Sequence, residues 1–326
     1  MNVDVHSHFF PVDAFQKASK FQERAPKIQL DGGKLMVTSG GGMRGNLGAT
    51  AYDPAARVKA LDQMAIDLQA ISPSPIMLFY WDNTSAAAYF SRLQNEAIQQ
   101  VVNAYPTRFV GFGSVPLQDI ESAIAIAREA KMLGLKGLEI GTTVGARALD
   151  DPGFEPFYDA VEDLDLLLFV HPTEDGVDTD DPLMTMLGNV VQFPYRTTLM
   201  IERMILRGLF EKYRNLRLCL SHGGGLVAFN IWRLDHAFRL RPEFRQHIAD
   251  SPSSYLKRLY FDSIVHSTAA LRYLIDTVGA DRVVIGTDYP MAMGDFDAVS
   301  KINDVSLSME HRNRILGENA LRALKL

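Results

Sequence analysis

Short apolar runs alternate with longer segments of helical periodicity along most of this chain. Residues in the short runs are mainly apolar or β-branched, which is typical of strands. Eight such runs cover residues 3–8, 68–74, 109–115, 135–141, 166–172, 216–223, 259–265 and 283–290. Between them the helical spacing of apolar positions predicts helices, among them 55–67, 86–104, 120–133, 197–212 and 268–278. Strands that alternate with helices in this way predict parallel βα units.

Eight βα units are the number that closes an α/β barrel. Such a barrel takes about 250 residues before insertions, and this chain has 326. An open, doubly wound sheet is the alternative for the same alternation. Polar residues end several widely separated strands, and barrel enzymes build their sites at those ends. The predicted fold is therefore an α/β protein, a (β/α)8 TIM barrel that forms one domain over residues 1–326.

One stretch interrupts the alternation directly after the first strand. Residues 9–52 connect that strand to the first helix and include a run of three glycines. Ordinary connections of this kind take about 2–6 residues. We therefore expect residues 9–52 to form a lid or a small insertion over the mouth of the barrel. A second long connection follows the fifth strand at 174–182, on the same face.

Composition limits the classes of protein to consider. Apolar residues make up 47% of the chain and charged residues 22%, which is ordinary for a globular protein with a large core. The net charge is −6 and no basic stripe stands out, so no nucleic-acid partner is expected. No apolar run approaches the roughly 18 residues that span a bilayer, so no membrane partner is expected. The single cysteine, Cys219, suits a reducing compartment, and the N-terminus does not resemble a signal peptide, so a cytoplasmic location is expected.

Two histidines lie two positions apart in the first predicted strand. Side chains alternate along a strand, so His6 and His8 are expected on the same face, inside the barrel near its mouth. Two imidazoles buried together cost free energy unless their polar atoms are satisfied, and a shared metal ion satisfies them. Two unrelated polar residues near a terminus are the alternative, and this pair alone does not decide.

Three more polar residues end other predicted strands. His171 ends the fifth in LLLFVHP, His222 the sixth in LCLSHGGG, and Asp288 the eighth in VVIGTDYP. Each alone also fits a structural role in the core. Together with His6 and His8 they occupy the same end of strands one, five, six and eight. Neutral imidazoles with one carboxylate suit Zn²⁺, and less specifically Mn²⁺ or Fe²⁺.

Five short motifs follow one another along nearly the whole chain. They are DVHSHFFP at 4–11, SVPLQD at 114–119, VHP at 170–172, SHGGG at 221–225 and GTDYP at 286–290. In these motifs the sequence resembles the amidohydrolase superfamily, particularly the branch typified by aminocarboxymuconate-semialdehyde decarboxylase. The resemblance implies one divalent ion, and the chemistry of the ligand set favours zinc, with manganese as the alternative. The ligands that it implies are His6, His8, His171 and Asp288, and His222 then acts with Asp288 in catalysis as the acid/base.

Two arginines are implied to bind the substrate carboxylate. Arg233 lies eleven residues after His222, roughly 16 Å away if that stretch is helical, too far to reach its own site easily. In the resembled decarboxylase this arginine enters the site of the neighbouring subunit, so the resemblance implies a homodimer. Arg44, in GGMRGN, is the second, although its spacing to the following YDP is one residue longer than in the family. A surface position is the alternative for both.

Three regions depart from the resembled decarboxylase. The segment after His171 lacks a tryptophan-containing stretch, Met291 replaces an aromatic residue, and Arg196 stands where relatives commonly carry an acid. All three are expected to line or support the pocket. They leave the metal chemistry intact and the identity of the substrate open.

The predicted function is metal-dependent, non-oxidative decarboxylation of a small unsaturated or aromatic carboxylic acid, a carbon–carbon lyase reaction. No organic cofactor is required, because the substrate itself can accept the electron pair. A metal-dependent hydrolase that opens a lactone or amide is the alternative on the same scaffold, and a hydratase is a third. A barrel that only binds metal is disfavoured by His222, since a structural site needs no uncoordinated histidine beside it.

Overall fold

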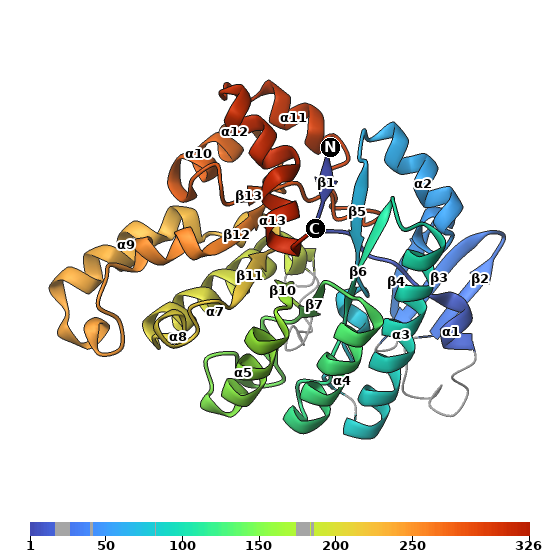
Figure 1. Cartoon of the computed structure of the whole chain (residues 1–326), viewed down its shortest axis with the longest axis horizontal. Helices are drawn as coiled ribbons and strands as arrows, with labels where there is room; N and C mark the ends of the chain where they lie inside the picture. The colour runs from blue at the N-terminus through green and yellow to red at the C-terminus, as the bar shows by residue number, and fades with distance from the viewer. Residues whose placement is uncertain (17–26, 40–41, 82, 174–182, 184–185) are drawn as a thin grey trace.

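Eight parallel strands close into a barrel at the centre of the molecule (Figure 1). In the order in which they pair, they are β1 (Val3–Asp4), β5 (Leu68–Ile71), β6 (Phe109–Gly113), β7 (Gly137–Ile140), β10 (Leu167–Val170), β11 (Arg217–Leu220), β12 (Leu259–Asp262) and β13 (Val283–Val284). The first and last strands meet, because the Val5 N–H donates to the Ile285 carbonyl at 2.9 Å and the His8 N–H to the Tyr289 carbonyl at 2.9 Å. The predicted (β/α)8 barrel is confirmed.

The computed structural model describes most of the chain. The described residues are 1–16, 27–39, 42–81, 83–173, 183 and 186–326. Parts of the predicted lid, 17–26 and 40–41, and the predicted long connection 174–182 lie outside them.

All eight predicted strands are present, but their regular parts are shorter than predicted. The predicted strand 3–8 is regular only as far as Asp4, and Ser7 and His8 then make isolated bridges. The predicted strand 283–290 likewise leaves the regular ladder after Val284. The apolar pattern continues beyond the ladder because these segments stay buried, while their backbones turn to place polar side chains at the mouth.

Helices surround the barrel on its outside (Figure 1). They are α2 (Pro54–Gln63), α3 (Thr84–Ala104), α4 (Ile120–Leu133), α5 (Glu155–Leu164), α7 (Phe193–Leu206), α8 (Leu209–Lys212), α9 (Val227–Leu240), α10 (Thr268–Val278), α11 (Ala298–Asp304), α12 (Met309–Asn313) and α13 (Asn319–Leu324). The helix predicted over 197–212 is two helices, because Gly208 between them has a φ of 73°. Among the described residues, no helix is long and apolar enough to cross a membrane.

An apolar plug fills the end of the barrel at which the strands begin. We use this name for one buried cluster that strand side chains and α13 share. Its members are Val3, Val5, Leu68, Ala70, Val110, Phe112, Leu167, Phe169, Cys219, Tyr260, Val284, Ala320, Ala323 and Leu324. Since α13 contributes to the plug, the last helix of the chain covers this end and leaves the other end for chemistry.

The segment after the first strand contains a small sheet of its own. It comprises α1 (Val12–Gln16) and the antiparallel strands β2 (Lys27–Asp31), β3 (Lys34–Ser39) and β4 (Gly42–Leu47), which the sequence pattern did not predict. A separate buried cluster, which includes Phe10 and Val37, packs it against Phe79 and Phe90 near the start of α3. The insertion therefore rests beside the strand end that carries His8.

Candidate active site

Four side chains from three barrel strands converge at the mouth of the barrel. One potential ligand atom from each of His6, His8, His171 and Asp288 lies within 4.8 Å of all the others, and all four residues are buried. The rings of His6 and His8 are 5.3 Å apart, and each is 5.1 Å from the ring of His171. The structure thus brings together the four residues that the sequence predicted as ligands. We call them the four-residue cluster.

The polar atoms that face one another in this cluster make no hydrogen bond, although Nε2 of His8 and of His6 lies 3.1 and 3.4 Å from Oδ1 of Asp288. Nε2 of all three histidines and Oδ1 of Asp288 are buried without a hydrogen bond among the described residues. Each Nδ1 instead faces an oxygen, which leaves the lone pair of each Nε2 directed at the centre. These oxygens are Asp262 Oδ2 at 2.6 Å from His6, the Pro73 carbonyl at 3.2 Å from His8 and the Pro172 carbonyl at 2.7 Å from His171. Four converging buried acceptors are costly alone and fit a divalent cation.

The carboxylates in and behind the cluster favour positive charge there. Burial opposes the charging of His6, but the carboxylates of Asp288 and Asp262 outweigh it and raise the pKa of His6 to about 10. Burial alone would raise the pKa of Asp288, yet the charge of His6 and the close approach of the His222, His6 and His8 rings hold it well below its usual range. Burial and the nearby imidazoles lower the pKa of His171. An ionised Asp288 and a neutral His171 are the states that bind a metal.

His222 stands beside the cluster without belonging to it. Its Nε2 is 3.9 Å from Asp288 Oδ2, and its ring is 4.8 Å from that of His171. Its side chain is 19% exposed, whereas the side chain of His6 is fully buried. His222 therefore faces the open side of the site, where a small molecule can approach it.

Two buried carboxylates were missed by the sequence reasoning. Asp262 ends β12 and accepts from His6, while Glu139 on β7 has Oε2 3.7 Å from Nδ1 of His8. Burial raises the pKa of Glu139 to about 7. Each is an acid inside an otherwise apolar strand, in LYFD and GLEI. Acids are rarely buried without partners, and that signal could have found both.

The two predicted arginines are not part of the described cluster. Arg44 lies in β4, but its side chain is outside the described part of the structure. Arg233 is exposed on α9 and, within the described residues, makes no hydrogen bond or ion pair with the four-residue cluster. Arg196, by contrast, contacts the segment that follows His171, because its Nη1 donates to the carbonyl of Thr173 at 3.3 Å.

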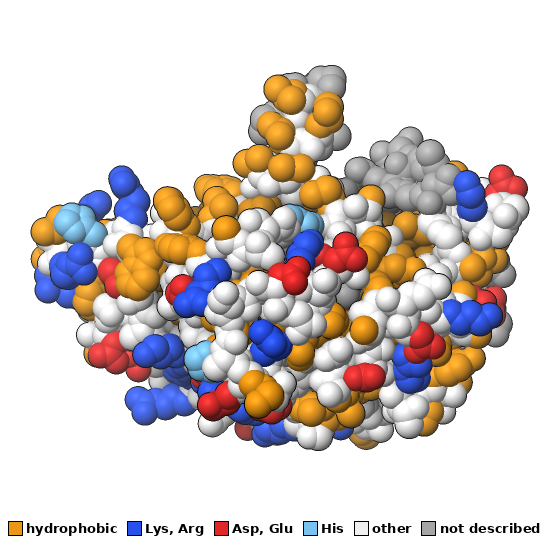
Figure 2. All heavy atoms as spheres, turned by 90° about the horizontal axis from the view of Figure 1, so that it is seen from above, with side chains coloured by type: hydrophobic (Ala, Val, Ile, Leu, Met, Phe, Trp, Pro, Cys, Tyr) orange, Lys and Arg blue, Asp and Glu red, His pale blue; other side chains and the backbone are white. Residues whose placement is uncertain are grey.

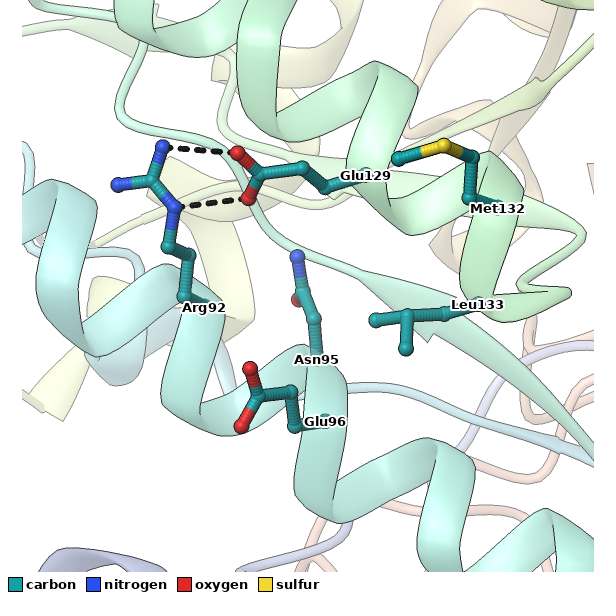
Figure 3. A pocket seen from close by; sticks show the side chains of 6 residues that line it. All are labelled: Arg92, Asn95, Glu96, Glu129, Met132 and Leu133. Carbon is teal, nitrogen blue, oxygen red and sulfur yellow. Dashed lines mark hydrogen bonds and ion pairs between the residues drawn. The ribbon is translucent and has the colours of Figure 1, made fainter.

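A separate hollow lies between α3 and α4, on the outside of the barrel (Figure 3). Its volume is about 320 Å³. Arg92 and Glu129 form an ion pair across it, with distances of 2.7 and 3.0 Å. The other lining residues are Asn95, Glu96, Met132 and Leu133. None of the predicted site residues is among these lining residues.

The chain resembles known proteins in both sequence and fold. The model of the amidohydrolase family matches residues 3–326. The chain is 33% identical to 2-amino-3-carboxymuconate-6-semialdehyde decarboxylase of Dictyostelium discoideum, covering 100% of this chain and 92% of that protein. The structure of 5-carboxyvanillate decarboxylase from Sphingomonas paucimobilis matches with a TM-score of 0.84 at 24% identity, over 100% of this chain and 99% of that one. A dihydroxybenzoic acid decarboxylase from Polaromonas sp. JS666, with bound manganese and the inhibitor 2-nitroresorcinol, has a TM-score of 0.77 at 23% identity, over 100% and 97% of the two chains.

Proposed function

The chain belongs to the amidohydrolase family, and we propose that it is a metal-dependent, non-oxidative decarboxylase of a small unsaturated or aromatic carboxylic acid. One observation carries this proposal: four buried ligand atoms without a hydrogen bond converge beside the partly exposed His222. The Dictyostelium relative and the Sphingomonas structure are both named decarboxylases, and this supports a carboxy-lyase over the hydrolase alternative.

The four-residue cluster would hold one divalent ion. Three neutral imidazoles and one carboxylate suit zinc, which we propose first, and manganese, which the Polaromonas enzyme contains. When bound, such an ion supplies a Lewis acid that orients the substrate and draws electron density from it. The chain itself fixes the three imidazoles through their Nδ1 atoms and excludes water from the buried side.

His222 would move the proton that the reaction requires. In a decarboxylation the carbon that carries the carboxylate gains a proton, the bond to the carboxylate breaks and carbon dioxide leaves. The electron pair of the broken bond restores the conjugation of the substrate. His222 is suited to this exchange because its Nε2 lies near Asp288 and its side chain reaches the open side. Asp288 would orient the imidazole during the transfer.

Arg233 would bind the carboxylate of the substrate in the site of a partner subunit, so the active form would be a homodimer. The helix that carries it and the residue before that helix also expose apolar side chains: Leu226, Phe229 and Trp232 are 51%, 79% and 51% exposed. The neighbouring α7 adds Tyr195 and Leu199. Figure 2 shows hydrophobic side chains on the surface to the left of the centre, the side on which α9 lies in Figure 1. Exposed apolar groups of this extent are typical of interfaces.

Three further assignments belong to the same proposal. Arg44 would contribute a second contact to the carboxylate, and residues 9–52 would form a lid at the mouth. The position of the insertion beside the strand end of His8 supports the lid. A cytoplasmic location agrees with a single cysteine, Cys219, which is buried and free.

The test of the reaction is carbon dioxide release by the metal-loaded protein. The panel would contain aminocarboxymuconate semialdehyde, dihydroxybenzoates and 5-carboxyvanillate. We expect release from at least one acid, and a fall of about 10²–10⁴-fold in His222→Asn with metal content unchanged. No release from any acid by a protein with confirmed metal would contradict the proposal, and ring-opening substrates would be next. Loss of metal from His222→Asn would contradict the role of His222.

The test of the shared site is a mixing experiment. His222→Asn and Arg233→Ala are each expected to be inactive. If Arg233 acts across the interface, random mixing of equal amounts of the two variants makes half of the dimers heterodimers. Each heterodimer has one intact site of its two, so about a quarter of wild-type activity returns. If Arg233 acts within its own subunit, mixing restores nothing.

A further inference from the structure

Asp262 accepts hydrogen bonds from four different donors. Its Oδ2 is 2.6 Å from Nδ1 of His6 and 2.9 Å from the backbone N of His222. Its Oδ1 is 2.7 Å from the backbone N of Gly223 and 3.1 Å from that of Ile264. The side chain is fully buried. One carboxylate therefore connects a residue of the four-residue cluster to the backbone of the residue that stands beside it.

The backbone that Asp262 holds is in an uncommon conformation. His222 has a φ of 54° and Gly223 a φ of 62°, and such a φ is costly for a residue with a side chain. Strained backbone of this kind persists only where surrounding contacts define it. Both N–H groups donate to Asp262, so this carboxylate supports, together with the turn's own backbone hydrogen bonds, the conformation that directs His222 at the site.

Gly286, which follows the neighbouring strand β13, packs closely against Asp262. A Cβ on Gly286, in the GTDYP motif, would lie 2.7 Å from Cβ and 3.0 Å from Cγ of Asp262. Contacts this short do not occur, so any larger residue at Gly286 would displace the carboxylate. The glycine of this motif is thus explained by close packing against Asp262.

Glu139 provides the contrast on the other side of the cluster. Its nearest cluster atom is Nδ1 of His8 at 3.7 Å, and that Nδ1 already has the Pro73 carbonyl at 3.2 Å. Neither oxygen of Glu139 has a hydrogen bond among the described residues. A buried acid near a histidine therefore need not organise the site, whereas Asp262 contacts two of its parts at hydrogen-bond distance.

We propose that Asp262 is a positioning residue that couples the metal-holding geometry of His6 to the placement of His222. The inference deepens the proposed function and rests on it for the metal role of His6. Through one rigid carboxylate, the direction of the His6 Nε2 and the direction of the His222 ring depend on each other.

Asp262→Asn is the most informative variant, because an amide cannot accept all four of the hydrogen bonds that this carboxylate accepts. Whichever oxygen becomes an NH₂ group, that group faces two donors, either those of His6 and His222 or those of Gly223 and Ile264. Asp150→Asn is the matched control, because the Asp150 side chain is only 3% exposed and pairs with arginines outside the site. If Asp262→Asn does not fold, Gly286→Ala tests the same contact with the carboxylate retained.

Two readouts do not require turnover. Titration of the metal-free protein with Mn²⁺ is expected to show about 10- to 100-fold weaker binding for Asp262→Asn and wild-type binding for Asp150→Asn. In the Zn²⁺-loaded protein, the imidazole N–H signal of His6 is expected far downfield because of its 2.6 Å bond, and it should be lost in Asp262→Asn. Mn²⁺ binding and an N–H signal like those of the wild type in this variant would overturn the inference.

A kinetic readout tests the coupling to His222. At saturating metal, kcat of Asp262→Asn is expected to stay reduced, and the same change is expected to add less than about twofold in a His222→Asn background. Full recovery of kcat with excess metal would show that Asp262 serves His6 alone, which overturns the coupling. If the wild type binds Mn²⁺ but releases no carbon dioxide, the decarboxylase proposal fails, and the titration and the N–H signal still decide this inference. If the wild type binds no metal, both fail.

Discussion

The two ends of the barrel interior are built by the same strands and have opposite chemistry. On β10, Phe169 belongs to the apolar plug, and His171, two residues later, belongs to the four-residue cluster. Val5 lies in the plug and His6 follows it directly, with its ring 4.8 Å from that of Phe169. The boundary between the two regions is therefore one layer of side chains.

Along each strand, the plug end therefore contributes to stability and the mouth end carries the groups suited to chemistry. A buried apolar side chain contributes roughly 1.5–3 kcal/mol relative to an exposed one. Buried polar atoms without hydrogen bonds cost free energy, and the cluster holds four of them. The plug thus offsets what the mouth of the barrel costs, and substitutions at the two ends should have different consequences.

The largest expected effect is a loss of stability at the plug. Phe112 is fully buried and packs 5.9 Å from the ring of Phe169. Phe112→Ala should lower the free energy of unfolding by about 3–5 kcal/mol, because it removes a large side chain and leaves a cavity. Urea unfolding of the metal-free protein measures this, and Mn²⁺ affinity of the folded variant should be unchanged. A loss of metal affinity with unchanged stability would contradict the conclusion that the plug determines stability and the mouth determines metal binding.

At the mouth, Asp288→Ala should lower metal affinity rather than the stability of the metal-free protein. It removes the one carboxylate among the converging ligand atoms, so Mn²⁺ affinity should fall by about 100-fold or more. Calorimetric titration measures the affinity, and circular dichroism checks that the metal-free variant stays folded. Binding within threefold of the wild type would show that the metal lies elsewhere.

The effect of pH on stability should differ between the metal-free and the metal-bound protein. Because the pKa of His6 is raised to about 10, its charge contributes stability that is complete below about pH 6.5 and is lost as pH rises toward 10. Metal binding requires the unprotonated Nε2, so stabilisation by Mn²⁺ should grow over the same range. We expect the increase in Tm with Mn²⁺ to be larger at pH 8 than at pH 6.5, by roughly 1–3 °C per pH unit. Equal increases at both pH values would contradict this.

The smallest expected effect is that of Cys219→Ala, which tests whether the plug is closed to solvent. Cys219 lies in it, and burial raises the pKa of its thiol well above the usual range. Cys219→Ala should cost about 1 kcal/mol of stability and leave metal affinity and turnover unchanged. In the native wild type the thiol should resist a thiol reagent and react only on unfolding. Rapid reaction in the folded protein would show that this end of the barrel is open.

Much of the barrel was predictable because its signals are local. The apolar runs located all eight strands, and the helix over 120–133 agrees with α4 (Ile120–Leu133). The insertion was recognised by its length, but its three strands were not, because their pattern is weak and they pair mainly with one another. The helix predicted over 197–212 was wrong at Gly208, where the backbone takes a positive φ.

By itself, the sequence determined that eight βα units form a barrel and which polar residues end their strands, because periodicity and strand ends are properties of neighbouring residues. Only the tertiary structure decided which atoms face one another. His6 and Asp262 are 256 positions apart and become hydrogen-bonded neighbours only when strands one and seven stand in one closed barrel. The direction of each imidazole depends on such a distant partner, so the four converging ligand atoms and the carboxylate behind them follow from closure of the barrel.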